Sequence, residues 1–259
     1  MLAPDFLRRH LPALGKTVFR LGLSASFGLP EAGVQEALER IQYLYLTPKM
    51  PLAPIRRALA HGREQYVLVG GPPMAYFPGS CRRAVERALR RLGTDYLDVL
   101  QISWLGVMSA LTGAMQEEMA RLRREGKVRT LGASIHDRQR AGRLALDSIL
   151  DLLMVRYNAA HPGAEVDLFP HLARRRPAVV AYTATSWRKL LRAPQGHTGR
   201  VPTAGDCYRF CLTHPAVDLV LTGPRTVDEL RQNLAEVEKG PLPPEEVAWM
   251  RSFGRLVHG

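Results

Sequence analysis

The amino-acid sequence predicts an α/β protein in which eight parallel strands and their helices form a (β/α)8 TIM barrel. Eight short, apolar, β-rich segments recur along the chain, and segments with helical spacing lie between them. Strands that alternate with helices favour a parallel sheet. The chain has 259 residues, close to the roughly 250 of a typical barrel of this kind. No linker, low-complexity segment or fixed-period repeat interrupts it, so we expect one domain over residues 1–259.

The predicted strands are runs rich in aliphatic, β-branched and aromatic residues. They cover residues 17–24, 41–47, 65–71, 96–103, 128–134, 150–158, 178–184 and 217–223. Functional sites in TIM barrels lie at the C-terminal ends of the strands, in the loops that lead to the helices. Candidate functional residues are therefore expected in the loops after these eight segments.

The segments between the strands carry helical patterns. Apolar residues at 84, 85, 88, 89 and 92 have the spacing of one helix face. Residues 116–128 predict a helix that closes at Gly126, with basic residues in its last turn, as the helix dipole favours. The longest predicted loop covers residues 187–202, between the seventh strand and its helix.

Composition indicates a soluble globular protein in a reducing compartment. Hydrophobic residues make up 46% of the chain and charged residues 23%, which is ordinary for such proteins. The longest uncharged segment, residues 99–116, contains Gln, Ser, Thr and Gly and does not resemble a membrane span. The first residues lack the apolar core of a secretory signal, and three cysteines make no disulfide framework. We expect a cytoplasmic protein with no membrane partner.

The net charge of +12 raises the question of an anionic partner. Its excess is mostly arginine, spread over many predicted helices with few aromatic residues among them. This distribution favours a solvated basic surface over a nucleic-acid site. An interaction protein that binds an acidic partner through this surface remains an alternative.

Several segments, in order along the chain, resemble the aldo-keto reductases, which are NADPH-dependent carbonyl reductases built on this barrel. Residues 82–104, RRAVERALRRLGTDYLDVLQISW, resemble the family's signature around the third helix and fourth strand. Residues 122–136, LRREGKVRTLGASIH, are similar to its fifth-strand segment. The sixth, seventh and eighth units are matched by RYNAAHPGAE, VVAYTATSW and HPAVDLVLTGPRTVDELRQNL. The resemblance runs from about residue 14 to residue 244 and implies a barrel of the aldo-keto reductase type.

The resemblance also assigns positions to the family's four catalytic residues. Family members use a Tyr as proton donor, a Lys that lowers the pKa of the Tyr, an Asp that pairs the Lys, and a His that orients the carbonyl. Here the Asp position is Tyr45, the Tyr position Met50, the Lys position Gly71 and the His position Ser103. An unassisted Tyr has a pKa near 10 and is a poor acid at neutral pH. The sequence therefore predicts a degenerate active site in which ordinary carbonyl reduction is doubtful.

At the nicotinamide end, the resemblance implies a partial cofactor site. The family holds the carboxamide with a Ser-Asn pair and a Gln. Here Ser134 is kept, whereas Ile135 and Met154 replace the Asn and the Gln and cannot make the same hydrogen bonds. Tyr182 stands where the family stacks an aromatic ring on the nicotinamide.

The phosphate end matches the family more fully. Gly223, Arg225 and Thr226 lead from the eighth strand into a helix, whose free N–H groups would suit a phosphate. Thr226 and Glu229 have the spacing of a capping box, so a well-capped helix is the simpler interpretation. Asn233 matches the family's Asn near the adenine. NADP(H) is therefore a possible cofactor.

The remaining candidates lie at predicted strand ends around one pocket. They are Tyr45, Lys49, Ser103, Trp104, His136 and Arg156. Trp104 is expected to be a pocket wall, and His136 a helix-start or solvated residue rather than a general base. A further hypothesis is that Tyr45 and Lys49, in YLTPK, bring a phenol and an ammonium together at the mouth.

Arg156 and a pair of cysteines each raise the question of a bound ligand or metal. By strand alternation Arg156 shares a face with Met154 and so points toward the cofactor position. A buried Arg needs an anion, for which an internal carboxylate is favoured over a ligand carboxylate or phosphate. Cys207 and Cys211 lie four residues apart on an apolar helix face, which favours core packing over a metal site.

Three functions remain open. The first is a barrel protein that binds a small molecule at its C-terminal mouth without the standard reduction residues, as a non-redox biosynthetic enzyme or a non-catalytic binding protein. The second is an NADPH-dependent oxidoreductase that uses Tyr45 and Lys49 instead. The third is the interaction protein with a basic surface.

Overall fold

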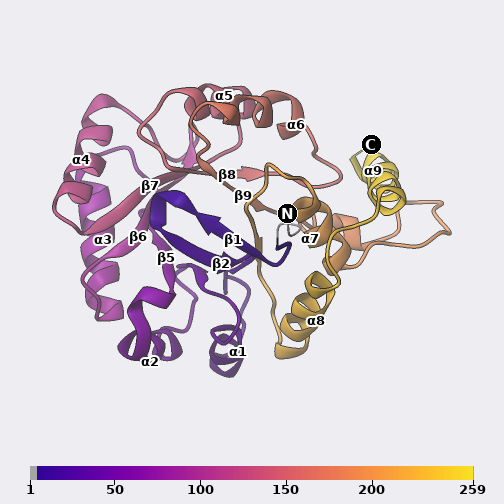
Figure 1. Cartoon of the computed structure of the whole chain (residues 1–259), viewed down its shortest axis with the longest axis horizontal. Coiled ribbons are helices and arrows are strands. Elements are labelled where there is room, and N and C mark those ends of the chain that lie inside the picture. Colours follow the sequence, from indigo (N-terminus) through magenta and orange to yellow (C-terminus); the bar gives the residue numbers. More distant parts are fainter. Residues whose placement is uncertain (1–4, 259) are drawn as a thin grey trace.

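The predicted barrel is confirmed by the computed structural model, which describes residues 5–258. Eight parallel strands close into a barrel in the order β10-β3-β4-β5-β6-β7-β8-β9, with the helices outside (Figure 1). The barrel strands are β3 (Leu21–Leu23), β4 (Tyr43–Tyr45), β5 (Val67–Gly70), β6 (Leu97–Leu105), β7 (Val128–Ile135), β8 (Leu152–Arg156), β9 (Ala178–Tyr182) and β10 (Leu219–Thr222). Each of them lies within or overlaps one predicted strand segment.

The outer layer consists of α-helices that follow the strands along the chain. They are α1 (Glu31–Ala37), α2 (Ala53–Gly62), α3 (Gly79–Leu92), α4 (Gly113–Arg124), α5 (Arg138–Leu146), α6 (Ala164–Asp167), α7 (Ala204–Thr213), α8 (Val227–Glu238) and α9 (Pro244–His258). The two helices predicted from spacing are confirmed as α3 and α4. Gly126, just beyond α4, has a φ of 74°, a conformation that glycine adopts without strain.

The first predicted strand, residues 17–24, is interrupted at Arg20. Its first half, β2 (Lys16–Phe19), pairs in antiparallel fashion with β1 (Arg8–Leu11), and only β3 enters the barrel. The Arg20 guanidinium is buried and donates to the carbonyl oxygens of Phe6, Leu212, Val217 and Asp218. These bonds fix the chain where it turns from the hairpin into the barrel.

The hairpin closes one end of the barrel. Its residues Leu11 and Val18 pack in the same buried cluster as Tyr43, Val67 and Val99 of the barrel interior. Asp218, at the entry to β10, accepts from Arg9 of the hairpin, from Arg176 and from the backbone N–H of Val179. Since this end is filled, ligands have access to the interior from the opposite end.

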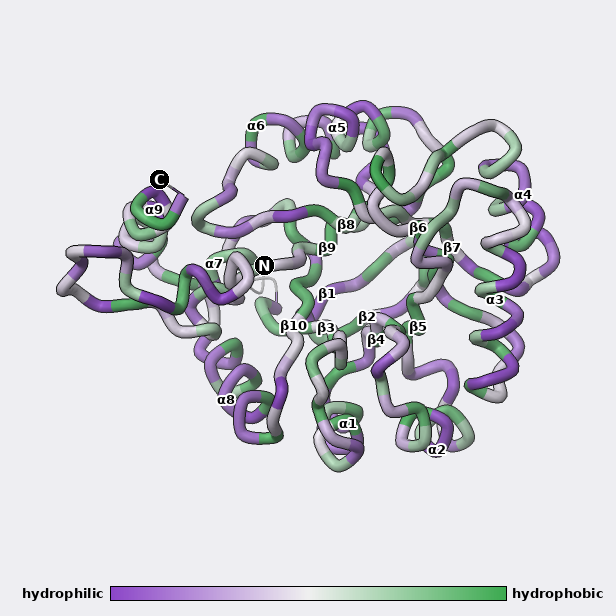
Figure 2. The backbone as a smooth tube through the Cα atoms, turned by 180° about the vertical axis from the view of Figure 1, so that it is seen from behind, coloured by the Kyte–Doolittle hydropathy of each residue, from purple (hydrophilic) through white to green (hydrophobic). Residues whose placement is uncertain are grey.

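The principal core lies between the sheet and the helices. Figure 2 shows the hydrophobic segments concentrated in the strands, whereas hydrophilic segments occur along outer helices such as α3 and α8. Within residues 5–258, no helix combines the length and the apolar character needed to cross a membrane.

Candidate functional site

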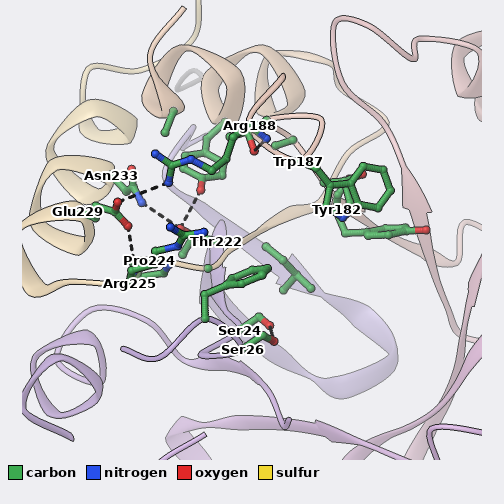
Figure 3. Close-up of a pocket in the computed structure, with 18 of the residues that line it drawn as sticks. Ser24, Ser26, Tyr182, Trp187, Arg188, Thr222, Pro224, Arg225, Glu229 and Asn233 are labelled. Carbon is green, nitrogen blue, oxygen red and sulfur yellow. Dashed lines mark hydrogen bonds and ion pairs between the residues drawn. The ribbon is translucent and has the colours of Figure 1, made fainter. Parts of the chain in front are cut away.

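A cavity of about 680 Å³ opens at the C-terminal end of the barrel. Its inner wall comes from strand ends and includes Tyr45, Trp104 and Tyr182. Its outer wall comes from the loop after β9 and from the segment between β10 and α8 (Figure 3). The cavity therefore lies at the end of the barrel where the sequence predicts ligand binding.

Ser134 is placed to donate a hydrogen bond into the cavity. It ends β7 with Ile135, and its Oγ accepts from the backbone N–H of Trp104 over 2.7 Å. The hydroxyl hydrogen is then free to reach another acceptor. Trp104 itself has a φ of 47°, an uncommon conformation for a bulky residue, and this hydrogen bond helps to hold it.

Tyr182, His136 and Trp104 form a contiguous cluster beside the cavity. The Tyr182 hydroxyl lies 2.8 Å from His136 Nε2. The Trp104 and His136 rings meet edge to face with centroids 5.3 Å apart. Burial raises the pKa of Tyr182, and burial together with the charge of Arg156 lowers the pKa of His136. Both groups are therefore uncharged at neutral pH.

His136 does not cap the following helix. Asp137 is the N-cap of α5, and its Oδ1 accepts from the N–H of Arg140 over 2.9 Å. His136 instead turns toward Tyr182 on β9. The sequence placed His136 at this strand end but gave no sign of its contact with Tyr182.

Arg156 lies at the end of β8, in register with Tyr182 of β9. Among residues 5–258, no carboxylate lies within ion-pairing distance of its guanidinium. The internal ion pair favoured from the sequence is therefore wrong, and the neighbouring strand ends instead bring His136 and Tyr182 near Arg156.

At the outer end of the cavity, Glu229 organises the start of α8. Thr226 caps the helix by accepting from the N–H of Glu229 over 3.1 Å. The Glu229 carboxylate accepts from the N–H of Arg225 rather than that of Thr226, so the predicted capping box is not reciprocal. Figure 3 shows Arg188 reaching toward Glu229, and their charged groups lie 3.6 Å apart.

Asn233 presents its oxygen to the cavity. Its Nδ2 donates to Thr222 Oγ1 over 3.1 Å, and that hydroxyl donates to Tyr208. Asn233 is buried and lines the cavity, and no contact within the described chain occupies its Oδ1. The amide oxygen can thus accept from a ligand amino group.

The loop after β9 is strained where it lines the cavity. Thr183, Ser186, Trp187 and Arg188 all have positive φ values, between 49° and 68°. Such conformations cost free energy for residues other than glycine, and they cluster at functional sites. The loop predicted from the sequence begins only at residue 187, and these conformations were not predicted.

The model of the aldo/keto reductase family matches residues 28–186, more than half of the chain. The chain belongs to the aldo/keto reductase family. The methylglyoxal reductase YeaE of Escherichia coli (strain K12) is 26% identical over 249 residues, which cover 88% of this chain and 86% of that protein. The NADH-specific methylglyoxal reductase of the same organism is 31% identical over 96 residues, 36% of this chain and 29% of that protein.

Solved structures of aldo-keto reductases share the fold. The apo form of AKR11C1 from Bacillus halodurans superposes with a TM-score of 0.77 at 23% identity, covering 95% of both chains. The aldo-keto reductase from Klebsiella pneumoniae in complex with NADPH gives a TM-score of 0.76 at 23% identity, covering 96% of this chain and 95% of that one. At such identities the likeness establishes the barrel of the aldo-keto reductase type.

Tyr45 and Ser103, to which the resemblance assigns the catalytic Asp and His positions, lie close together at the barrel mouth. Tyr45 ends β4 and lines the cavity, and the side chains of Ser103 and Gln101 lie near its hydroxyl. These neighbours lower the pKa of Tyr45, but burial outweighs them, so the pKa is raised. Lys49 is exposed in the following turn and does not line the cavity.

Met50 and Gly71, to which the resemblance assigns the other two positions, offer no acid–base group. Met50 is buried, with 3% of its surface exposed. At Gly71 an added Cβ would lie 2.0 Å from the backbone oxygen of Gln101, closer than real Cβ contacts come. The backbone of β6 thus leaves no room for a side chain at Gly71.

The arginine-rich surface is partly neutralised within the chain. Arg82 on α3 bonds to Glu118 and Glu125, and Arg231 on α8 bonds to Glu36. Cys207 and Cys211 are buried in α7, and burial raises the pKa of both thiols. Among residues 5–258, no group of three His, Cys, Asp or Glu side chains is placed to hold a metal.

Proposed function

We propose that the cavity binds NADP(H) and a small organic ligand, and that the protein does not perform the carbonyl reduction of its family. The proposed absence of carbonyl reduction rests on Gly71, where the Gln101 backbone excludes any side chain. Without an ammonium there, a phenol at the barrel mouth has no neighbour that lowers its pKa enough for proton transfer at neutral pH.

The residues around the cavity fit a dinucleotide. Arg225 is exposed at the start of α8, and its guanidinium has no hydrogen-bond or ion-pair partner in the described part of the chain. Together with Arg188 it would hold phosphate groups. The Asn233 oxygen would accept from the adenine amino group, and the Ser134 hydroxyl would donate to the nicotinamide carboxamide. A bound dinucleotide carries a transferable hydride, but under this proposal the pocket does not pass it to a carbonyl.

The Tyr182 ring would support the nicotinamide, with its hydroxyl fixed by His136. Hydride arrival at a carbonyl builds negative charge on oxygen, which a positioned acid must neutralise. Tyr45 remains a neutral phenol with a raised pKa, and Ser103 offers only a hydroxyl. We therefore propose that the pocket serves a non-redox conversion or binding alone.

Cofactor binding is tested by titrating the protein with NADPH while tryptophan fluorescence is recorded. Trp104 and Trp187 line the cavity, so a bound dinucleotide should quench them saturably. Arg225→Met should weaken binding about tenfold, because a charge-assisted hydrogen bond contributes roughly 1.5–3 kcal/mol. Arg143→Met removes the same charge from the exposed face of α5 and serves as the control. Absence of saturable quenching contradicts the cofactor proposal.

A second candidate is an NADPH-dependent oxidoreductase that uses Tyr45 and Lys49. Its support is the Tyr45 hydroxyl at the cavity wall, together with the methylglyoxal reductases among the relatives. Turnover of methylglyoxal that is lost in both Tyr45→Phe and Lys49→Met would establish this candidate in place of the first. Lys49→Arg, which keeps the charge, should then retain more activity than Lys49→Met.

A further inference from the structure

Arg156 faces the barrel mouth. It follows Met154 by two residues on β8, so both side chains lie on the same face of the strand. Met154 lines the cavity, and Tyr182, the register partner of Arg156 on β9, does so as well. Arg156 itself lies one layer beyond Met154, next to the cavity rather than in its wall.

The Arg156 guanidinium has unused hydrogen-bonding capacity. Within residues 5–258 it makes no ion pair and donates no hydrogen bond, although it is partly buried. By contrast, Arg20 donates four hydrogen bonds from its buried position. A partly desolvated cation without a counter-charge is unfavourable, so its position is explained best by an anion that binds there.

The titratable side chains at the strand ends beside Arg156 are neutral. His136 and Tyr182 are neutral and hydrogen-bonded to each other. Asn158 positions His161. The Asn158 Nδ2 donates to the backbone oxygen of Thr183, and the Asn158 Oδ1 accepts from His161 Nδ1 over 3.2 Å. Burial, and then the charge of Arg156, lower the pKa of His161 to about 4. Both imidazoles are therefore neutral at pH 7, and the charges that lower the pKa of His161 include those of Lys189 and Arg138 besides that of Arg156.

We propose that Arg156 and His136 form a subsite for the carboxylate of a small organic ligand at the barrel mouth. This inference rests on the proposed ligand-binding role of the mouth and names the chemical class of the ligand. A planar guanidinium matches a carboxylate through two parallel hydrogen bonds. The His136 ring, held against Trp104 and Tyr182, adds a donor or gains a proton as the anion arrives.

A carboxylate fits this subsite better than a phosphate. The Asp137 carboxylate caps α5 directly after His136, and this negative charge opposes a dianion. One guanidinium balances a monoanion. The exposed rings of Phe27, Trp104 and Trp187 line the cavity and would accommodate the apolar body of the same ligand.

The test compares benzoylformate, a carboxylate beside a ketone and a phenyl ring, with its neutral methyl ester. Binding is followed by tryptophan fluorescence and by the NMR signals of the histidine rings. Wild-type protein should bind the acid at least about tenfold more tightly than the ester. Arg156→Met should weaken binding of the acid about 10- to 100-fold and change the affinity for the ester by no more than about twofold. Arg143→Met, with the same loss of charge on α5, should change neither.

A measurement on the wild-type protein tests the subsite even if the Arg156→Met variant misfolds. The charged or titratable groups that face His136 from the neighbouring strands are Arg156 on β8 and Tyr182 on β9. A bound carboxylate offsets the charge of Arg156, so the pKa of His136 should rise when benzoylformate binds. Binding should accordingly strengthen as the pH falls through the pKa of His136 in the complex.

The outcomes separate this inference from the cofactor proposal. Equal affinity for acid and ester, or an unchanged affinity in Arg156→Met, overturns the carboxylate subsite whatever NADPH does. Tighter competition by inorganic phosphate than by benzoylformate also overturns it, in favour of a phosphate site. Failure of NADPH to bind, with the acid still preferred over the ester, contradicts the cofactor proposal and leaves the subsite standing.

Discussion

Substituting Gly71 by alanine tests the feature on which the proposed loss of reduction depends. The new Cβ would lie 2.0 Å from the Gln101 oxygen and 2.9 Å from its carbonyl carbon. Normal contact between carbon and oxygen needs more than 3 Å, so one of the two strand ends must move by over 1 Å. Overpacking costs about 1–3 kcal/mol, and because the obstacle is backbone, we expect a loss near 3 kcal/mol.

The loss is measured by urea unfolding, with a matched control in the same chain. At Gly113, in the first turn of α4, an added Cβ meets no atom of the described chain within 4 Å. Gly113→Ala should therefore be neutral or stabilise the fold by up to about 1 kcal/mol. If Gly71→Ala is as stable as the wild type, the strand ends can separate at little cost. A lysine would then be tolerated at this position, and our reasoning about it would be refuted.

Three further predictions follow from other parts of the molecule. In an NMR titration, His136 should show a pKa below the usual 6.5 of histidine, and Arg156→Gln should raise that pKa; an unchanged pKa in the variant would show that the charge of Arg156 does not act on His136. Asp218→Ala should lower the free energy of unfolding by about 2–3 kcal/mol, because a buried carboxylate loses its hydrogen bonds from two partly exposed arginines and from the Val179 N–H; a loss below about 1 kcal/mol would show that these bonds do not stabilise the hairpin. Thiol reagents should react slowly with the native protein, since burial raises the thiol pKa, to about 12 for Cys81, and should modify all three thiols after unfolding; rapid reaction of the native protein would contradict the buried positions.

Most of the fold could be predicted from the sequence because strand and helix periods alternate so regularly. Each barrel strand, from β3 to β10, lies at a predicted segment. The N-terminal hairpin was missed because residues 17–24 read as one apolar run, whereas the bonds of the buried Arg20 to distant carbonyls divide it. Such long-range hydrogen bonds leave no local pattern in the sequence.

The site was predictable in position but not in contacts. The strand-end rule placed Tyr45, Trp104 and Tyr182 around one opening, as the cavity shows. The contact of His136 with Tyr182 joins β7 to β9 across the intervening strand, so it depends on side-chain directions that spacing does not give. The lack of a carboxylate near Arg156 is likewise a property of several strands together.

The family resemblance assigned the lysine position to Gly71, but the sequence could not reveal that this residue has no room for a side chain. Gly71 looked like a simple substitution in the sequence. The structure shows the Gln101 backbone in the space that a side chain would need. The close approach of the chain after β5 to the backbone of β6 therefore explains why only glycine fits at residue 71.

The most direct test of the central claim is a hydride-transfer measurement with deuterium-labelled NADPH. The protein is incubated with the labelled cofactor and methylglyoxal, and the product is analysed by mass spectrometry against a reaction without protein. We predict saturable cofactor binding and no deuterium in the product above that background. Deuterium incorporation that depends on the protein and disappears in Tyr45→Phe would contradict the account.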